Sequence, residues 1–359
     1  MTIAVTATAV SLRLRLHYKA TRAANVMCKN QTMNKPNLFT YATSELSQDA
    51  FICWLLSWAS PEYKDSDVEL YECAIRLIKV FFEKHKLSAP QKIEQIEVRK
   101  QDNNIDVLCI INFKYPIIIE DKTRTKHHSN QLTRYLENIK GRNYEDKDII
   151  PIYFKTEDQA SYSDVIKNGY QPFSRADFLS VLSFYKGKNS ILIDYRNYLQ
   201  SITDNINSYK MIELSKWGWY SWIGFYLELQ KRLGDGCWDY VANPNGGFLG
   251  FWWHFQGNSE CEQYLQLEQD KFCFKVWVKK ESQRKHLRSK WHKIISNKAG
   301  DTQLNLVRPI RFGYGEYMTV CVFDGEYRKT TDGIIDMDAT IAQFRKAEEL
   351  LKSVHEITY

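Results

Sequence analysis

The run YPIIIEDK, from Tyr115 to Lys122, constrains the fold of this chain more than any other stretch of its sequence. Its three consecutive isoleucines indicate a strand that is buried on both faces, as in a sheet covered by helices on either side. The run ends in three charged residues, which are costly to bury unless they face water, pair with one another or hold an ion. We therefore expect a covered sheet with a charged group at the end of one strand.

Two further strand patterns precede this run. KIEQIEVRKQ (92–101) alternates apolar and polar residues, as a half-buried strand does, and IDVLCIINF (105–113) is a second continuous apolar run. Asn103-Asn104 and Lys114-Tyr115 are short enough to be hairpin turns between the three strands. The sequence thus predicts an antiparallel meander that ends at the charged group.

Helical periodicity surrounds the meander. Helices are predicted over 45–59, 67–85, 129–141, 174–185 and 191–202, and a further buried strand over 148–156. Two helices, three strands, a helix and a strand in this order indicate an α/β domain with a mixed central sheet between helical layers.

The composition of the chain changes near Ser208, and aromatic residues become frequent from Trp217 onward. A strand hairpin is predicted over 262–278 and helices over 281–296 and 339–354. We therefore expect one domain over 37–207 and a second, aromatic-rich α+β domain over 208–359, which serves substrate binding, dimerisation or regulation. Residues 1–36 show no periodic pattern and are predicted to be a disordered extension.

Charge and cysteine usage set broad limits on the class of protein. The net charge of +6, from 49 Lys+Arg and 43 Asp+Glu, is compatible with a polyanionic partner but does not require one. The 8 cysteines form no CxxC pair and no zinc spacing, so they are predicted to be reduced core thiols of a cytoplasmic protein. No apolar run approaches the roughly 20 residues of a membrane span, so we expect no membrane partner.

The charged strand end has a specific chemical use. Residues two apart in a strand share a face, so Glu120 and Lys122 project together while Asp121 points the other way. If the two apolar runs form a hairpin, Asp106 lies near Glu120. Two carboxylates can hold Mg²⁺, which polarises a phosphodiester and lowers the pKa of a bound water. Lys122 could orient or deprotonate that water, or stabilise the charge that develops on phosphorus.

This pattern resembles the PD-(D/E)xK nuclease superfamily. Asp106 is followed after thirteen residues by Glu120-Asp121-Lys122, and the next helix carries QLTRY, which is similar to the QxxxY element of the RecB-like branch. The resemblance, which is to bacterial standalone members, implies a restriction-endonuclease-like αβββαβ core. It also implies a Mg²⁺ or Mn²⁺ site formed by Asp106, Glu120 and the main-chain carbonyl of Asp121. Ile105 stands in place of the proline that gives the family its name.

The resemblance implies roles for further residues. Lys122 would position the attacking water, and Gln131 and Tyr135, one helical turn apart, would support the site. Glu45 in the first helix or Glu97 on the preceding strand would add another acid. The implied reaction is hydrolysis that leaves a 5′-phosphate, with DNA as the favoured substrate. Standalone members of this type suggest a role in phage defence or in mobile elements, and the sequence leaves a homodimer open.

Basic residues are candidates for phosphate contact, which gives affinity without sequence information. These candidates are Arg124, Lys126, Arg134, Arg284 and Arg288. The basic stretch 279–293 could equally be a solvated helix face. The tryptophans from Trp217 onward could stack bases, as in single-strand binders, although at this density core packing is the favoured interpretation.

Other interpretations compete with the nuclease hypothesis. Glu120 and Lys122 could form an ion pair at a solvated strand end, worth about 0.5 kcal/mol, and Glu45 could be a first-turn acid that faces the helix dipole. At the level of the whole protein, one alternative is a catalytically silent nucleic-acid-binding or sensor protein with the same fold. The other is a protein-interaction module that acts through residues 208–359.

Overall fold

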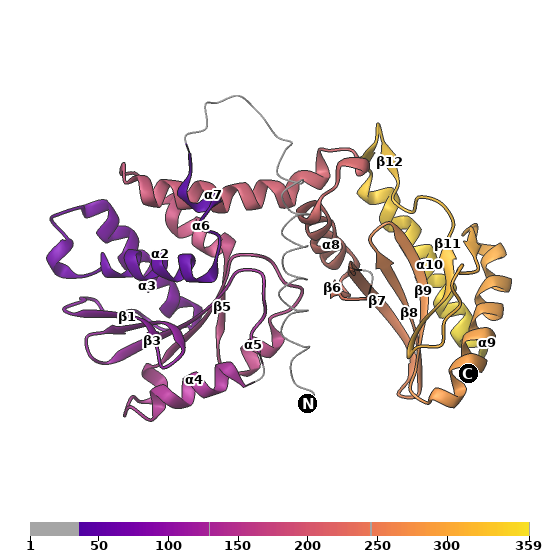
Figure 1. Cartoon of the computed structure of the whole chain (residues 1–359), viewed down its shortest axis with the longest axis horizontal. Helices are drawn as coiled ribbons and strands as arrows, with labels where there is room; N and C mark the ends of the chain where they lie inside the picture. Colours follow the sequence, from indigo (N-terminus) through magenta and orange to yellow (C-terminus); the bar gives the residue numbers. More distant parts are fainter. Residues whose placement is uncertain (1–35, 129, 245, 359) are drawn as a thin grey trace, which may run out of the picture.

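The computed structural model describes residues 36–358, with the exception of Ser129 and Asn245. Two β-sheets, each with its own helices, lie side by side and are connected by a long helix (Figure 1). The expected N-terminal extension over residues 1–36 lies outside the described residues, apart from Pro36.

The first sheet has five strands in the order β1-β2-β3-β4-β5. These are β1 (Ile96–Asp102), β2 (Ile105–Ile111), β3 (Tyr115–Lys122), β4 (Ile150–Lys155) and β5 (Gln171–Ser174). The first three are antiparallel, and β4 and β5 join parallel to β3. The mixed central sheet and the element order confirm the predicted fold class. Strand β5 was not expected, because four residues that include a proline carry no strand pattern.

Asparagine residues form the tight turns of the meander. The first turn is Asn103-Asn104 as predicted, with φ of 51° and 68°, the left-handed values that a type I′ turn requires. The second turn lies earlier than Lys114-Tyr115, because Asn112 and Phe113 adopt φ of 51° and 54°. Tyr115 already belongs to β3, so the predicted position of this turn is wrong.

Helices cover both faces of the first sheet (Figure 1). They are α2 (Glu45–Ser57), α3 (Val68–Lys84), α4 (Gln131–Lys140), α5 (Ser163–Lys167), α6 (Arg175–Ser183) and α7 (Ser190–Asn207). Ile117 and Ile119 pack in the core that contains α2 and α3, whereas Ile118 packs with Leu132 and Tyr135 of α4. Alternate residues of β3 therefore face opposite helical layers, as the period of a strand requires.

The second sheet is antiparallel, with strand order β10-β11-β9-β8-β7-β6. Its strands are β6 (Cys237–Val241), β7 (Phe248–Asn258), β8 (Cys261–Glu268), β9 (Lys271–Val278), β10 (Leu306–Val307) and β11 (Tyr317–Phe323). Its helices are α8 (Trp219–Leu233), α9 (Glu281–Ala299) and α10 (Met337–Thr358). A small ribbon is formed by β12 (Thr330–Thr331) and β13 (Ile334–Ile335). This arrangement agrees with the α+β architecture expected after Ser208.

Short 3-10 helices complete the described elements. They are η1 (Leu38–Thr40), η2 (Pro61–Tyr63), η3 (Asp146–Asp148), η4 (Ser208–Lys210), η5 (Leu214–Lys216) and η6 (Gly300–Thr302).

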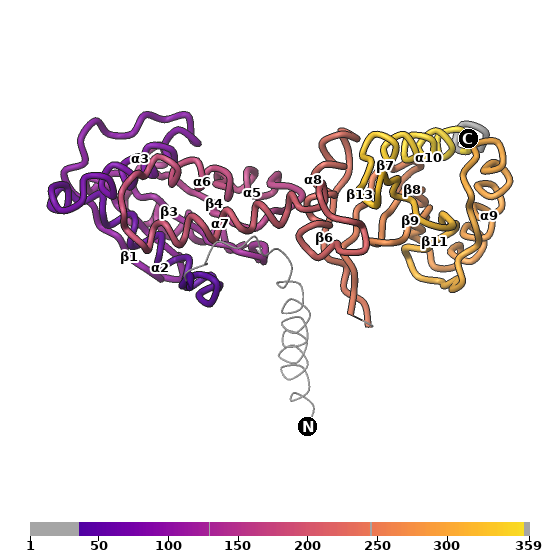
Figure 2. Tube along the Cα trace, turned by 90° about the horizontal axis from the view of Figure 1, so that it is seen from above, coloured from indigo at the N-terminus to yellow at the C-terminus, as the bar shows by residue number. Residues whose placement is uncertain are grey.

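The connection between the two sheets is a close crossing of α7 and α8 (Figure 2). A Cβ added to Gly224 of α8 would lie 1.9 Å from the carbonyl oxygen of Ile206 in α7, so only glycine permits this approach. The buried apolar core runs without interruption from the first sheet through these helices into the second. The expected boundary at 207/208 coincides with the end of α7, and the division into two domains stays a prediction.

No helix in the described part of the chain is long and apolar enough to cross a membrane. The cysteines of the described residues are free thiols, and five of these seven are buried.

Candidate active site

The antiparallel register of β2 and β3 brings Asp106 beside Glu120. Val107 pairs with Ile119, and the Oδ2 atom of Asp106 accepts a hydrogen bond of 2.9 Å from the main-chain N–H of Asp121. Glu120 and Lys122 lie on one face of β3, where Lys122 Nζ is 2.5 Å from Glu120 Oε1. The structure therefore joins the three residues that the sequence singled out.

Four oxygen atoms surround the Lys122 ammonium. Glu120 Oε1 lies at 2.5 Å and the main-chain carbonyl oxygen of Asp121 at 2.8 Å. Asp106 Oδ2 lies at 3.7 Å and Glu45 Oε2 at 3.8 Å. Strands β2 and β3 and helix α2 thus direct acceptor oxygens to the single ammonium group of Lys122.

Burial dominates the electrostatics of this group. The side chain of Glu120 is 0 % exposed, and burial, together with the nearby Asp106 carboxylate, raises the pKa of Glu120 to about 8. For Lys122, burial opposes the charged form, but the carboxylates of Glu120, Asp106 and Glu45 outweigh burial and raise the pKa of Lys122. Glu120 Oε2 is buried and has no hydrogen-bond partner among the described residues. The site thus has an acidic oxygen without a partner.

Glu45 reaches the site from the start of α2. Ser44 caps this helix by accepting a hydrogen bond from the main-chain N–H of Ser47, which makes Glu45 the first helical residue. Glu45 Oε1 accepts hydrogen bonds of 3.2 Å from the N–H of Thr123 and 2.8 Å from the hydroxyl of Thr125. Glu45 therefore contacts both Lys122 and the loop that follows β3.

Gln131 and Tyr135 lie on the helix that covers the Glu120 face of the sheet. The Gln131 amide donates a hydrogen bond of 2.9 Å to the Tyr135 hydroxyl. Burial raises the pKa of Tyr135, and the charges of Glu120 and Asp106 act in the same direction. Tyr135 thus lies within electrostatic reach of the acidic group.

The side chain of Asp121 points to the opposite face and meets α2. Asp121 Oδ1 accepts a hydrogen bond of 2.5 Å from Gln48, whose own oxygen accepts one of 2.8 Å from the Tyr195 hydroxyl. Burial and the neighbouring Asp49 raise the pKa of Asp121 well above its ordinary range, and burial and Asp106 raise the pKa of Asp49 to about 6. Only the main-chain carbonyl of Asp121 faces Lys122.

Sequence reasoning missed Gln101 of β1. Its φ of 59° is left-handed, and its amide nitrogen lies 3.4 Å from Asp49 Oδ2 and 3.5 Å from Asp106 Oδ1. Unusual backbone of this kind tends to occur at functional sites. Nothing in the sequence around Gln101 signals a left-handed residue.

Sequence reasoning also missed Lys155, at the end of the neighbouring parallel strand β4. Lys155 pairs with Lys122 in the sheet register, is 1 % exposed and donates to the carbonyl oxygens of Thr123 at 2.5 Å and Thr125 at 2.8 Å. The signal that singled out Lys122, a charged residue at the end of an apolar strand, is also present in IPIYFK.

Glu97, the other candidate for an extra acid, does not reach the site. It pairs with Ile110 along β1, several residues from the Asp106 end of β2. Its carboxylate forms an ion pair of 2.7 Å with Arg99, and its side chain is 44 % exposed. The expectation for Glu97 is therefore corrected, because the register of β1 holds it too far along the strand.

Three of the five basic candidates belong to the first half of the chain. Arg124 and Lys126 belong to the loop after β3, where Arg124 Nε donates to Glu157 at 2.9 Å and Lys126 Nζ lies 2.7 Å from Asp239. Arg134 is exposed on α4, and the described residues give its side chain no partner.

The other two basic candidates are engaged inside the C-terminal half. Arg288 is 4 % exposed, donates to the carbonyl oxygens of Phe312 and Gly313 and packs on the Phe312 ring. The Arg284 side chain is 18 % exposed and donates to the carbonyl oxygen of Val278. Their expected contact with phosphate stays a prediction, and in this structure each guanidinium hydrogen-bonds to local main chain.

The residues around Lys122 fit a divalent cation. In the part of the chain that the structure describes, no three His, Cys, Asp or Glu side chains are grouped closely enough to hold a metal ion. Asp106 and Glu120 do offer two carboxylates beside the Asp121 carbonyl, and the buried Glu120 Oε2 lacks a partner. Mg²⁺ accepts such sparse oxygen sets, because it usually keeps several of its waters.

Comparison with known proteins agrees with this geometry. The model of the PD-(D/E)XK nuclease superfamily matches residues 36–217. This span covers half of the 359-residue chain and includes the whole first sheet. No curated protein and no solved structure matches the chain significantly.

Proposed function

The chain belongs to the PD-(D/E)XK nuclease superfamily, and we propose that it is a metal-dependent nuclease that hydrolyses phosphodiester bonds at the Asp106–Glu120–Lys122 site. One observation carries the proposal: oxygens of Glu120, Asp121, Asp106 and Glu45 surround the Lys122 ammonium at 2.5 to 3.8 Å. A solvated strand end gives no reason to gather carboxylates from three elements around a buried lysine.

Each residue has a role in this proposal. Asp106, Glu120 and the Asp121 carbonyl would hold the cation, which would supply polarisation of the phosphodiester and a lower pKa for a bound water molecule. Lys122 holds the attacking water through its ammonium and counters the charge that develops on phosphorus. Gln131 and Tyr135 support the Glu120 side of the site.

Several finer statements depend on the resemblance and belong to the proposal. They are Mg²⁺ or Mn²⁺ as the metal, DNA as the substrate, a 5′-phosphate product, a bacterial cytoplasmic location, a role in phage defence or mobile elements, and a homodimer.

Cleavage of supercoiled plasmid and of a single-stranded oligonucleotide tests the proposal. We expect metal-dependent cutting by the wild type that EDTA abolishes and that falls by at least about 100-fold in Asp106→Asn and Lys122→Ala. Glu97→Gln is the matched control, because it neutralises an acid on an adjacent strand outside the site, and it should cut like the wild type. Cutting that survives both site substitutions would contradict the assignment. Binding of nucleic acid without cutting would favour the silent binder.

A further inference from the structure

The loop after β3 has two chemically different sides. Thr123 and Thr125 face Glu45, and their carbonyl oxygens accept hydrogen bonds from Lys155. The side chains of Arg124 and Lys126 leave the loop toward the C-terminal half, where they line a pocket. Two residues of extended chain span at most about 7 Å, so Arg124 lies close to the catalytic Lys122. The loop therefore links the active site to this pocket.

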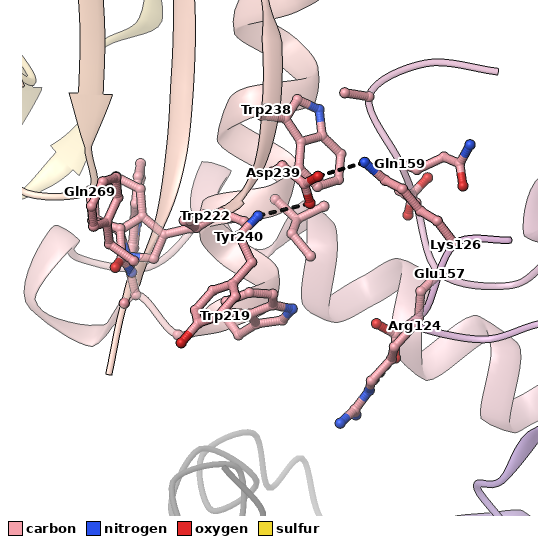
Figure 3. A pocket seen from close by; sticks show the side chains of 18 of the residues that line it. Arg124, Lys126, Glu157, Gln159, Trp219, Trp222, Trp238, Asp239, Tyr240 and Gln269 are labelled. Carbon is pink, nitrogen blue, oxygen red and sulfur yellow. Dashed lines mark hydrogen bonds and ion pairs between the residues drawn. The ribbon is translucent and has the colours of Figure 1, made fainter. Parts of the chain in front are cut away.

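The pocket lies between the two halves of the chain and has a volume of about 490 Å³, within the usual range for small ligands. Hydrogen bonds between the two halves fix its walls relative to each other. The Tyr220 hydroxyl donates to Glu157 at 2.9 Å, and Gln230 of α8 donates to the carbonyl oxygen of Ala160 at 2.9 Å. Lys126 and Asp239 meet across its edge (Figure 3). A ligand thus finds a preformed cavity.

Several indole rings and one phenol ring line the wall from the C-terminal half. Trp219 and Tyr240 are half-buried, and their ring centroids lie 6.0 Å apart (Figure 3). Deeper in the wall, Trp222 is already in contact with the Arg328 guanidinium, 4.6 Å from its ring. The Tyr240 ring is inclined by 57° to the Trp219 ring, and its hydroxyl already donates to the carbonyl oxygen of Gly246, so Trp219 is the ring on which a flat ligand would stack.

Polar groups of the wall lack partners. The indole nitrogen of Trp238, a residue that is 5 % exposed, is buried and has no hydrogen-bond acceptor among the described residues, and the same holds for the indole nitrogen of Trp217. An indole N–H can only donate, so each needs an acceptor such as a ring nitrogen or carbonyl oxygen.

The charges at the pocket are balanced. Arg124 pairs with Glu157, Lys126 with Asp239, and Asp158 with Arg175 at 2.7 Å. The first turn of α8 also lines the pocket, and its N-cap is Gly218, which provides no side-chain cap. A pocket with balanced charges and aromatic residues in its wall suits a neutral aromatic ring system, and the positive end of α8 suits a phosphate attached to it.

We propose that this pocket receives one unstacked nucleobase of the substrate strand, which stacks against Trp219 while the adjoining backbone passes Arg124 to the active site. The inference rests on the proposed nuclease function and defines its substrate as a strand with a base out of the stack. Such a base can come from a single strand or can be flipped out of a duplex.

Binding is tested in the Asp106→Asn background with Mg²⁺, by fluorescence anisotropy of a short labelled single strand and of its duplex. We expect Trp219→Ala to weaken binding by about 5- to 100-fold, the range for loss of one base–aromatic stack, and Trp219→Phe to retain most of the affinity. Phe255→Ala is the matched control, because this aromatic residue of β7 is 47 % exposed and outside the pocket. It should bind like the parent.

An abasic scan then tests whether a base occupies the pocket. At one strand position, loss of the base should weaken binding by the parent but not by Trp219→Ala, because the contact is already absent. A loss of affinity at that position in the single strand alone would identify a single-stranded substrate. An equal loss in the duplex would identify base flipping, and both results support a base in the pocket. The base-binding role of the pocket would be overturned if Trp219→Ala bound as tightly as the parent, or if no abasic position weakened binding. This would hold even if the wild type still cut nucleic acid. Absence of metal-dependent cutting by the wild type would instead overturn the proposed function.

Discussion

At the scale of single residues, Glu45 is the acid that distinguishes this site from an ion pair on a strand. One of its oxygens accepts from Thr123 and Thr125, and the other lies 3.8 Å from Lys122 Nζ. Its position at the start of α2 suits a carboxylate, since the helix dipole stabilises negative charge there. Glu45 therefore combines a structural contact with the loop and an electrostatic contact with Lys122.

Glu45→Gln separates these two contributions. Glutamine keeps an oxygen acceptor for Thr123 and Thr125 but loses the charge beside Lys122. We expect cleavage to fall by about 10- to 100-fold, the usual cost of removing a group that supports a metal site. The melting temperature should change little, because the hydrogen bonds remain. Rates that match the wild type in a cleavage time course would show that Glu45 only caps its helix.

At the scale of elements, the ends of β3 and β4 act together. Lys122 and Lys155 are paired across the two parallel strands, and Lys155 fixes the carbonyl groups of the loop that carries Arg124 and Lys126. Burial of a lysine costs free energy, because the charged form loses its solvation by water. Burial lowers the pKa of Lys155 to about 8 from its ordinary value of 10.5.

This pKa predicts a pH-dependent stability. Between about pH 8 and pH 10.5 the unfolded chain holds a proton on Lys155 that the folded chain has released, so the free energy of unfolding rises with pH. Relative to Lys155→Met, the wild type should gain up to about 3 kcal/mol across this window. Urea unfolding of both proteins at several pH values measures the difference. Lys167→Met, at an exposed position, is the control. If the difference in unfolding free energy between the wild type and Lys155→Met did not change with pH, the lowered pKa of Lys155 would be refuted.

At the scale of the whole molecule, the crossing of α7 and α8 sets how the two sheets are joined. Gly224 allows the two helix backbones to touch, and the apolar core continues across this contact. The pocket between the halves is built on the same crossing, since the first turn of α8 forms part of its wall. The shape of this pocket therefore depends on the packing of these helices.

Gly224→Ala should disturb that packing. The added methyl group would meet the main-chain oxygen of Ile206 at 1.9 Å, and no side-chain rotation can relieve this clash. We expect a loss of about 2–3 kcal/mol of stability, in the upper range for overpacking, measured by chemical denaturation. Gly300→Ala is the control, because nothing lies within 4 Å of its Cβ position. Equal stability of Gly224→Ala and the wild type would show that α7 and α8 are not held this closely.

The amino-acid sequence by itself determined the meander, the helices around it and the meeting of Asp106, Glu120 and Lys122. These features follow from local rules: the period of a strand fixes which residues share a face, and a short antiparallel turn fixes which residues lie opposite. Even the misplaced turn at Lys114-Tyr115 left Asp106 at the Glu120 end, because adjacent antiparallel strands must run back along each other.

Only the tertiary structure decided which distant residues complete the site. Glu45 reaches Lys122 whereas Glu97 does not, and Arg288 is buried and hydrogen-bonds to local main chain. The pocket likewise joins Arg124 to Trp219, almost a hundred residues away. Local patterns encode the face of an element on which a residue lies but not the element that packs against that face. That choice depends on long-range packing of the whole core, which no short stretch of sequence specifies.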